Sequence, residues 1–203
     1  MYAIDALRSE HRVIEQVLSC LEKIADQCAK DGVLDGESAR QAIDFLQNFA
    51  DRCHHGKEEG RLFPIMEMRG VLRERGPIGV MLHEHDQGRQ HIKVMVDSLR
   101  DAEREDLASC DTFSDHAHAY VRLLRDHIWK EDNRLFPMAE QTLTSEDRLS
   151  LEHSFEQVEA GEMGIGTHER YLNLANQLAD RFGVALADLG RVPACSHCGH
   201  ATR

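Results

Sequence analysis

The sequence predicts an all-α protein, and three observations carry this prediction. Only 5% of the 203 residues are aromatic and only four are proline, and long stretches consist of Ala, Glu, Leu, Arg and Gln with few β-branched runs. Apolar residues recur at alternating spacings of three and four, the period of an amphipathic helix. The pattern also occurs twice along the chain. We therefore expect an up-down-up-down four-helix bundle, a duplicated helical hairpin, with two extra C-terminal helices and a short tail.

The first two expected helices carry the first copy of the pattern. Over residues 3–30 the spacing continues without a gap only if His11 occupies the apolar seam, which comprises Ile4, Leu7, Ile14, Leu18, Leu21 and Ala25. A second helix is expected from about Glu37 towards Pro64, with the proline ending or kinking it. Its residues at intervals of four form a single stripe on one face: Ala50, His54, Glu58 and Leu62.

The next two expected helices carry the second copy. A helix is expected to open at Pro77, a favoured first-turn residue, with His85 in the seam formed by Ile78, Met81, Gly88, Ile92, Met95 and Leu99. The fourth helix, over about 112–136, has the same four-residue stripe as the second: Leu123, His127, Glu131 and Leu135. Both histidines of this half thus have a counterpart in the first half.

Aligning the halves shows how regular the repeat is. The seam of the first helix matches that of the third at a constant offset of 74 residues, and the motif from His54 to Glu67 matches that from His127 to Glu140 at an offset of 73. The spacing between the two histidines of each half agrees to one residue. A duplicated hairpin accounts for this agreement.

The C-terminal third has a different pattern. A capped helix is expected over about 145–160, then a turn at the glycine-rich "GEMGIG", then a helix over "THERYLNLANQLADRF". We expect three parts, a bundle, an accessory helical hairpin packed on it and a flexible tail, over residues 1–140, 141–188 and 189–203. The tail holds Cys195, His197, Cys198 and His200, which lie too close together for a closed zinc site; chance metal binding is favoured over intermolecular ligation or a redox thiol pair.

Charge and hydropathy exclude several classes of partner. The formal net charge is −12 and no predicted helix has a basic face, which argues against nucleic acid and anionic membrane surfaces. No apolar run approaches the roughly 20 residues of a membrane span, and the N-terminus lacks the apolar core of a signal peptide. We expect a cytoplasmic protein whose six cysteines are mainly free thiols.

The inward histidines and glutamates predict a metal centre. A lone inward histidine is usually a hydrogen-bonded core residue, but packing alone does not explain four of them at repeat-related positions, two with glutamate partners. His-x-x-x-Glu pairs share a helix face, and mixed imidazole and carboxylate donors suit first-row metals. Two carboxylates from different helices can bridge two cations. The hypothesis is a di-iron or di-manganese site.

Four motifs resemble those of the hemerythrin-like, or HHE cation-binding, family, over roughly residues 5–140. They are "EHRVI" at 10–14, "HHGKEEGRLFP" at 54–64, "EHDQGR" at 84–89 and "HIWKEDNRLFP" at 127–137. The resemblance implies an up-down-up-down bundle around two iron ions in a non-haem, oxo- or hydroxo-bridged centre. By motif position it implies that Glu58 and Glu131 are candidate bridges and that the full ligand set is His11, His54, Glu58, His85, His127 and Glu131.

One position departs from the oxygen-carrying members. These have a further histidine one turn before the third-helix histidine, where this sequence has Met81. His83 cannot replace that histidine, because two residues correspond to a rotation of about 200° around the helix. The pattern resembles the branch with four histidines and two glutamates, which includes di-iron proteins linked to nitric oxide, peroxide and iron-centre repair. Reversible oxygen carriage is therefore disfavoured.

Other residues near the stripes are expected to support the ligands rather than bind metal. They are Glu15, His55, Glu59 and Tyr120; His55 and Glu59 have Ile128 and Asp132 as counterparts, so the repeat does not extend to them. For Glu15 the alternatives are a surface role and, because it lies four residues after His11, a further metal ligand. For Tyr120 the alternatives are closing the end of the bundle, which is favoured, and lining an access channel.

The expected function is to bind, sense or react with oxygen, nitric oxide or peroxide. As an enzyme the protein would be a di-iron oxidoreductase that decomposes peroxide or reduces nitric oxide, although no catalytic residue is assigned. The alternatives are a non-catalytic iron- or oxygen-binding protein and an iron-dependent sensor that acts through a protein partner or through self-association. All three share the same ligand set.

Overall fold

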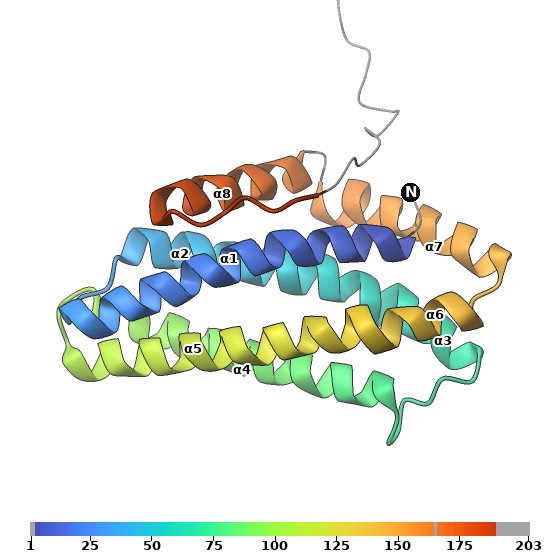
Figure 1. Ribbon diagram of the computed structural model, residues 1–203, viewed down its shortest axis with the longest axis horizontal. Coiled ribbons are helices and arrows are strands. Elements are labelled where there is room, and N and C mark those ends of the chain that lie inside the picture. Colours follow the sequence, from blue (N-terminus) through green and yellow to red (C-terminus); the bar gives the residue numbers. More distant parts are fainter. Residues whose placement is uncertain (1–2, 165, 190–203) are drawn as a thin grey trace, which may run out of the picture.

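The structure, a computed structural model, describes residues 3–164 and 166–189, and within these ranges every regular element is a helix (Figure 1). The all-α prediction is therefore confirmed. The tail residues Cys195, His197, Cys198 and His200 lie outside the described residues. None of the described helices has the length and apolar character needed to cross a membrane.

The first half consists of α1, Ala3–Asp31, and a long segmented helix that begins at Gly36. Within the second helix, α-helical and π-helical stretches alternate: α2 is Gly36–Phe45, π-helical η1 is Leu46–His55, π-helical η2 is Glu58–Leu62 and α3 is Phe63–Met68. The Asp35 side chain caps α2 by accepting a hydrogen bond from the Ser38 amide.

The second half repeats this arrangement. Helix α4 is Pro77–Ala102 and begins at the expected proline. It is followed by α5, Leu107–Lys130, then π-helical η3, Glu131–Leu135, then α6, Phe136–Thr142. The η2 and η3 segments are thus related by the same offset of 73 residues as the sequence motifs.

Neither internal proline ends its helix. Pro64 lies in the first turn of α3 and Pro137 in the first turn of α6, and the chain stays helical across both. Before each proline the wider π turn is closed by an amide that bonds five residues back: Phe63 N–H donates to the Glu58 carbonyl, and Phe136 N–H donates to the Glu131 carbonyl. The interruption expected at Pro64 is therefore a π turn rather than a helix end.

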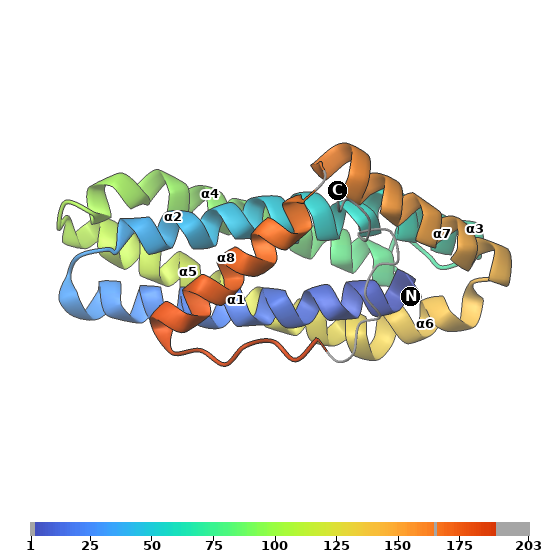
Figure 2. The same cartoon turned by 90° about the horizontal axis from the view of Figure 1, so that it is seen from above.

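The C-terminal part forms two more helices on the outside of the molecule. Helix α7, Ser145–Gln157, opens with the expected capping box between Thr144 and Asp147 and continues as π-helical η4, Val158–Met163; α8 is Thr167–Phe182. Helix α8 crosses α1 and α2 diagonally (Figure 2), and α7 packs against η2 and α1.

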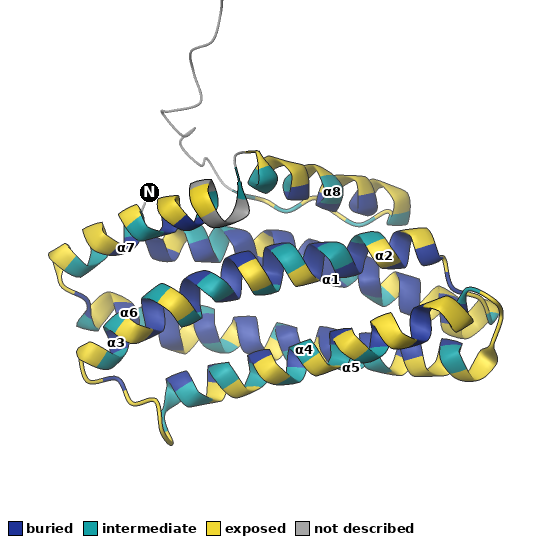
Figure 3. Ribbon diagram, turned by 180° about the vertical axis from the view of Figure 1, so that it is seen from behind, coloured by how far each residue is buried: buried dark blue, intermediate teal, exposed yellow. Residues whose placement is uncertain are grey.

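The four long helical segments pack side by side, α1 against α5, α5 against α4, and the α2–η1 segment against α4 and α1. Their buried faces point inward and their outer faces are exposed (Figure 3). The apolar interior is split into two clusters. On α1 the smaller cluster ends at Leu7 and the larger begins at Val13. His11 lies between them, so a buried polar layer separates the two apolar regions.

Candidate metal centre

The six residues that the sequence marks as ligands all lie in this buried layer. Each is at most 1% exposed, and they come from four segments of the chain: His11 from α1, His54 and Glu58 from η1 and η2, His85 from α4, and His127 and Glu131 from α5 and η3. The structure thus brings together residues that are up to 120 positions apart in the sequence.

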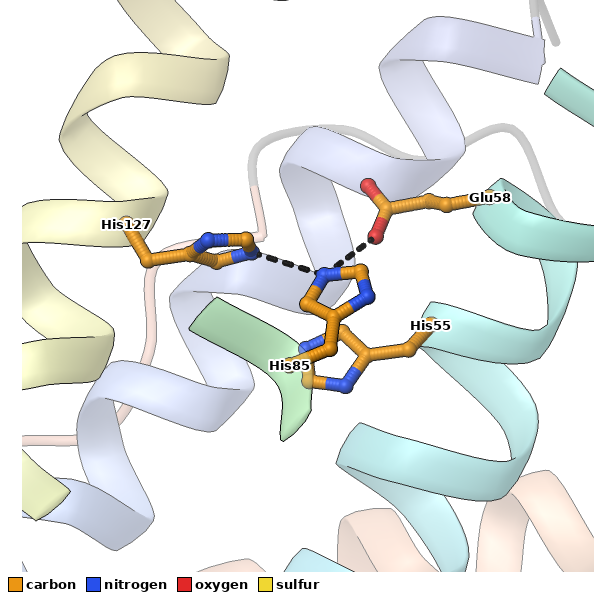
Figure 4. A group of neighbouring side chains, drawn as sticks. All are labelled: His55, Glu58, His85 and His127. Atoms are coloured by element: carbon orange, nitrogen blue, oxygen red, sulfur yellow. Dashed lines mark hydrogen bonds and ion pairs between the residues drawn. The ribbon is translucent and has the colours of Figure 1, made fainter. Parts of the chain in front are cut away.

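The side chains form two groups, and within each group the potential ligand atoms all lie within 4.8 Å of one another. One group is His11, His54, Glu58 and Glu131; the other is His55, Glu58, His85 and His127. Figure 4 shows the second group, in which the ring of His85 faces both His127 and the Glu58 carboxylate. The Nε2 atoms of His85 and His127 are 3.0 Å apart.

Both glutamates lie between the two groups. Glu58 has Oε1 at 3.7 Å from Nε2 of His54 and Oε2 at 3.6 Å from Nε2 of His85. Glu131 has Oε2 at 3.2 Å from Nε2 of His11 and at 3.3 Å from Nε2 of His127. Each carboxylate therefore contacts a histidine of each group, the arrangement that carboxylates bridging two cations require.

The centre contains buried polar atoms that the protein does not satisfy. His11 Nε2 and all four carboxylate oxygens of Glu58 and Glu131 are inaccessible to solvent and have no hydrogen-bond partner. Burial, and then repulsion from Glu131, raises the pKa of Glu58 well above its ordinary value. Unsatisfied buried acceptors and paired carboxylates are costly. Bound cations would remove this cost, so the donor set fits a metal site.

The environment of each histidine decides whether its ring is protonated. Burial lowers the pKa of His54 to about 4, so this ring is neutral. Burial also opposes protonation of His127, but the Glu131 carboxylate outweighs it and raises the pKa of His127 to about 9. Because a metal binds only the deprotonated ring nitrogen, a cation at this position would displace that proton.

Each of the four histidines contacts a carboxylate through Nδ1, on the side away from the centre. The pairs are His11 with Asp132 at 2.9 Å, His54 with Glu10 at 2.9 Å, His85 with Glu59 at 2.7 Å and His127 with Glu84 at 3.0 Å. An ionised carboxylate only accepts, so Nδ1–H is the donor and Nε2 is the ring nitrogen that faces the interior. This is the usual support of metal-bound histidine.

These four carboxylates follow the repeat, and sequence reasoning found only one of them. Glu10 and Glu84 directly precede the seam histidines, and Glu59 and Asp132 directly follow the inward glutamates. Glu59 was expected to support the ligands; Glu10, Glu84 and Asp132 were missed. The repeated Glu-His dipeptide and the acidic residue after each inward glutamate were the available signal.

Each supporting carboxylate is in turn paired with a cation. The pairs are Glu10 with Lys57, Glu84 with Lys130, Asp132 with Arg12 and Glu59 with Arg89. Lys57 and Lys130 are themselves related by the 73-residue offset. The cations keep the carboxylates ionised, and hence able to accept from the histidines.

His55 lies in the centre, although the sequence placed it on the flank. Its ring stacks on that of His85, with centroids 3.8 Å apart and planes inclined by 15°, and its Nδ1 lies 3.3 Å from Asp51. The wider π turn of η1 explains why two consecutive histidines both face inward. One of its ring nitrogens belongs to the group of potential ligand atoms formed with Glu58, His85 and His127.

The remaining expected residues, Glu15 and Tyr120, have other partners. Glu15 is partly exposed and pairs with Arg125 at 3.4 Å. Tyr120 is buried against Gly88, where an added Cβ would lie 3.3 Å from its ring, and burial, followed by the Asp51 charge, raises its pKa. The described contacts of neither residue include the six expected ligands.

The position that distinguishes the oxygen carriers is apolar here. Met81 is buried in the smaller apolar cluster, and His83 is exposed. The structure therefore supplies no histidine one turn before His85 on α4.

Comparison with known proteins gives matches over most of the chain. Residues 2–139 match the hemerythrin HHE cation-binding domain. An uncharacterised protein of Mycobacterium tuberculosis is 22% identical over 182 residues, which cover 90% of this chain and 71% of that protein.

Shorter matches are found with iron-sulfur cluster repair proteins named YtfE. The protein from Dickeya chrysanthemi is 36% identical over 89 residues, covering 42% of this chain and 40% of that protein. The protein from Edwardsiella ictaluri is 33% identical over 106 residues, covering 51% and 44%. No solved structure matches at a comparable level of significance. Because the domain match extends over well more than half of the sequence and includes every residue of the centre, this chain belongs to the hemerythrin HHE cation-binding family.

Proposed function

We propose that the protein binds two iron ions, one held by His11 and His54 and the other by His85 and His127, with Glu58 and Glu131 bound to both. The observation that carries the proposal is the pair of carboxylates, each in contact with both histidine groups and each with two unsatisfied buried oxygens. Mixed imidazole and carboxylate donors from four helices suit a dinuclear iron site.

The scaffold in this proposal is an up-down-up-down four-helix bundle. The packing of α1 on α5, α5 on α4 and α4 on the α2–η1 segment supports it, as do the short connections between successive long helices. In such a bundle the two hairpins contribute equivalent halves of the centre.

When bound, two iron ions supply paired one-electron redox changes and open positions for a small molecule. The chain's own residues prepare the site for this. The four Nδ1–H donors fix the ring planes through hydrogen bonds to carboxylates. The apolar clusters on both sides keep bulk water from the polar layer.

The small molecule that we propose is peroxide or nitric oxide, with oxygen as an oxidant of the reduced centre. Met81 in place of histidine argues against reversible oxygen carriage, as reasoned from the sequence. The relatives named for iron-sulfur cluster repair support a role in iron-dependent stress responses. Those matches cover under half of each relative, so the proposal takes from them only the iron-dependent chemistry.

A second candidate is an iron-dependent sensor that binds without turnover. It is favoured by the contact that η4 of the C-terminal segment makes with a residue adjoining the centre, through the ion pair of Glu159 with Lys57. In this function the C-terminal helices would present the state of the centre to a protein partner.

Metal analysis of the purified protein, followed by absorption spectra before and after addition of peroxide or nitric oxide, tests these functions. We expect close to two iron ions per chain and a spectral change accompanied by consumption of many equivalents of the small molecule. A spectral change limited to one equivalent would favour the sensor. A protein that binds no iron would refute both.

A further inference from the structure

Lys57 is a fully buried lysine at the boundary between the centre and the C-terminal helices. Its side chain is 0% exposed, and its ammonium lies 2.5 Å from Oε1 of Glu10 and 2.6 Å from Oε1 of Glu159. It also lies 5.6 Å from the centre of the Phe155 ring. A buried ammonium is tolerated only when its charge is compensated, so both carboxylates are needed to hold it.

The ammonium is one step from a candidate ligand. Glu10 accepts from Lys57 through Oε1 and from His54 Nδ1 through Oε2. Three consecutive contacts therefore lead from Glu159 in η4, through Lys57 and Glu10, to His54. Every member except Glu159 is at least nine-tenths buried, and the side chain of Glu159 is 41% exposed.

In the other half of the centre the lysine–glutamate–histidine contacts recur, but the described residues include no counterpart of Glu159. Lys130, the repeat counterpart of Lys57, pairs with Glu84, which accepts from Nδ1 of His127. The Lys130 side chain is 32% exposed, and among the described residues its ion pairs involve Glu84 alone. The C-terminal segment thus contacts one half of a nearly symmetric centre.

The difference changes the charge beside each histidine. Glu84 and Lys130 cancel, whereas Glu10, Lys57 and Glu159 together carry one negative charge. Because the Lys57 ammonium also pairs with Glu159, it neutralises less of the Glu10 charge. Glu10 is therefore a stronger acceptor for the His54 N–H. A stronger acceptor at Nδ1 makes the Nε2 lone pair a better metal donor.

We propose that Glu159 and Lys57 are positioning residues for the metal ion on His54, so that segment α7–η4 completes one half of the centre. This inference rests on the proposed function, because it concerns the affinity of one of the two proposed ions. Linkage makes the effect reciprocal: if docking of the segment strengthens metal binding at His54, metal binding strengthens docking of the segment by the same factor.

The first test is a titration of metal-free protein with Fe²⁺ without oxygen, in competition with a chelator. We expect Glu159→Gln to weaken one of the two ions by up to about tenfold, no more than the low end of the loss seen when a histidine's own hydrogen-bond partner is removed, and to leave the other unchanged. Glu156→Gln is the matched control, since Glu156 is an exposed acid on the neighbouring turn of α7. Equal affinities in the wild type and Glu159→Gln would overturn the inference.

The second test measures the reverse effect by amide hydrogen exchange of residues 145–163, with and without Fe²⁺. In the wild type and in Glu156→Gln we expect metal to slow this exchange; in Glu159→Gln we expect the metal-dependent difference to vanish. Lys130→Met should weaken the ion at the other half and leave metal-dependent exchange of the segment intact. If Glu159 were only structural, its loss would raise exchange equally in both states.

The wild-type measurement needs no variant, so the inference stays testable even if a substitution prevents folding. Absence of metal protection over residues 145–163 in the loaded wild type would refute the coupling. The two proposals fail separately: a wild type without bound iron refutes the di-iron function, whereas two ions of unchanged affinity in Glu159→Gln refute only the role of Glu159.

Discussion

Nδ1 of His54 lies 2.9 Å from Oε2 of Glu10, a residue 44 positions earlier on another helix and adjacent to a second candidate ligand, His11. The same relationship recurs in the second half, where His127 contacts Glu84, the neighbour of His85. His54 and His127 are thus each oriented by the helix that carries the other expected histidine ligand of the same group. Metal binding and helix packing are therefore expected to depend on each other.

The first prediction concerns metal content and stability. We expect His54→Ala and His127→Ala each to lower the iron content below two per chain and to lower the melting temperature of the iron-loaded protein. A ligand that binds only the folded state stabilises it by about 2.7 kcal/mol at a free concentration 100 times its Kd. Metal analysis and calorimetry with and without iron measure both effects. Full iron retention in both variants would refute the ligand assignment.

The second prediction concerns Glu10. Glu10→Gln retains the shape of the side chain but removes its charge, and should weaken metal binding about 10- to 100-fold. Glu15→Gln, on the same helix but paired with Arg125 at the surface, should leave affinity unchanged. Chelator competition compares the two. Equal effects would mean that net charge, and not the His54 contact, determines affinity.

The third prediction separates a coupled pair of ions from two independent ions. Because Glu58 and Glu131 each contact both histidine groups, Glu58→Gln or Glu131→Gln should lower occupancy of both sites together, well below one iron per chain. Glu59→Gln should have a smaller effect, since Glu59 contacts Nδ1 of His85, the nitrogen that faces away from the centre. Iron content and the visible absorption of the oxidised protein report on this. Loss of a single ion in Glu58→Gln would indicate independent sites.

The fourth prediction concerns His55, whose ring is stacked on His85. A ring parallel to that of a ligand does not direct its nitrogens at the same ion, so His55→Phe should retain two irons. His55→Ala leaves a cavity beside His85 and should lower the free energy of unfolding by about 2–5 kcal/mol, as other large core truncations do. Should His55→Phe lose an ion, His55 would be a ligand after rotation of its ring.

The sequence by itself determined the helices and the inward stripes. Spacings of three and four residues, the repeat at offsets of 73 and 74, and the His-x-x-x-Glu pairs are local properties of a helix, and they placed His11, His54, Glu58, His85, His127 and Glu131 on inward faces. The structure brings all six into one buried layer. The capping box at Thr144 and the start of α4 at Pro77 were readable for the same reason.

Only the tertiary structure decided which residues of different helices meet. The contact of Glu10 with His54 and that of Lys57 with Glu159, 102 residues apart, depend on how far each helix is shifted and rotated against its neighbour. The π turns in η1, η2 and η3 add to that rotation, and that of η1 turns His55 inward, which a period of 3.6 does not reveal. Periodicity fixes the face of one helix; packing of the apolar clusters fixes the register between helices, and with it the partners of every histidine.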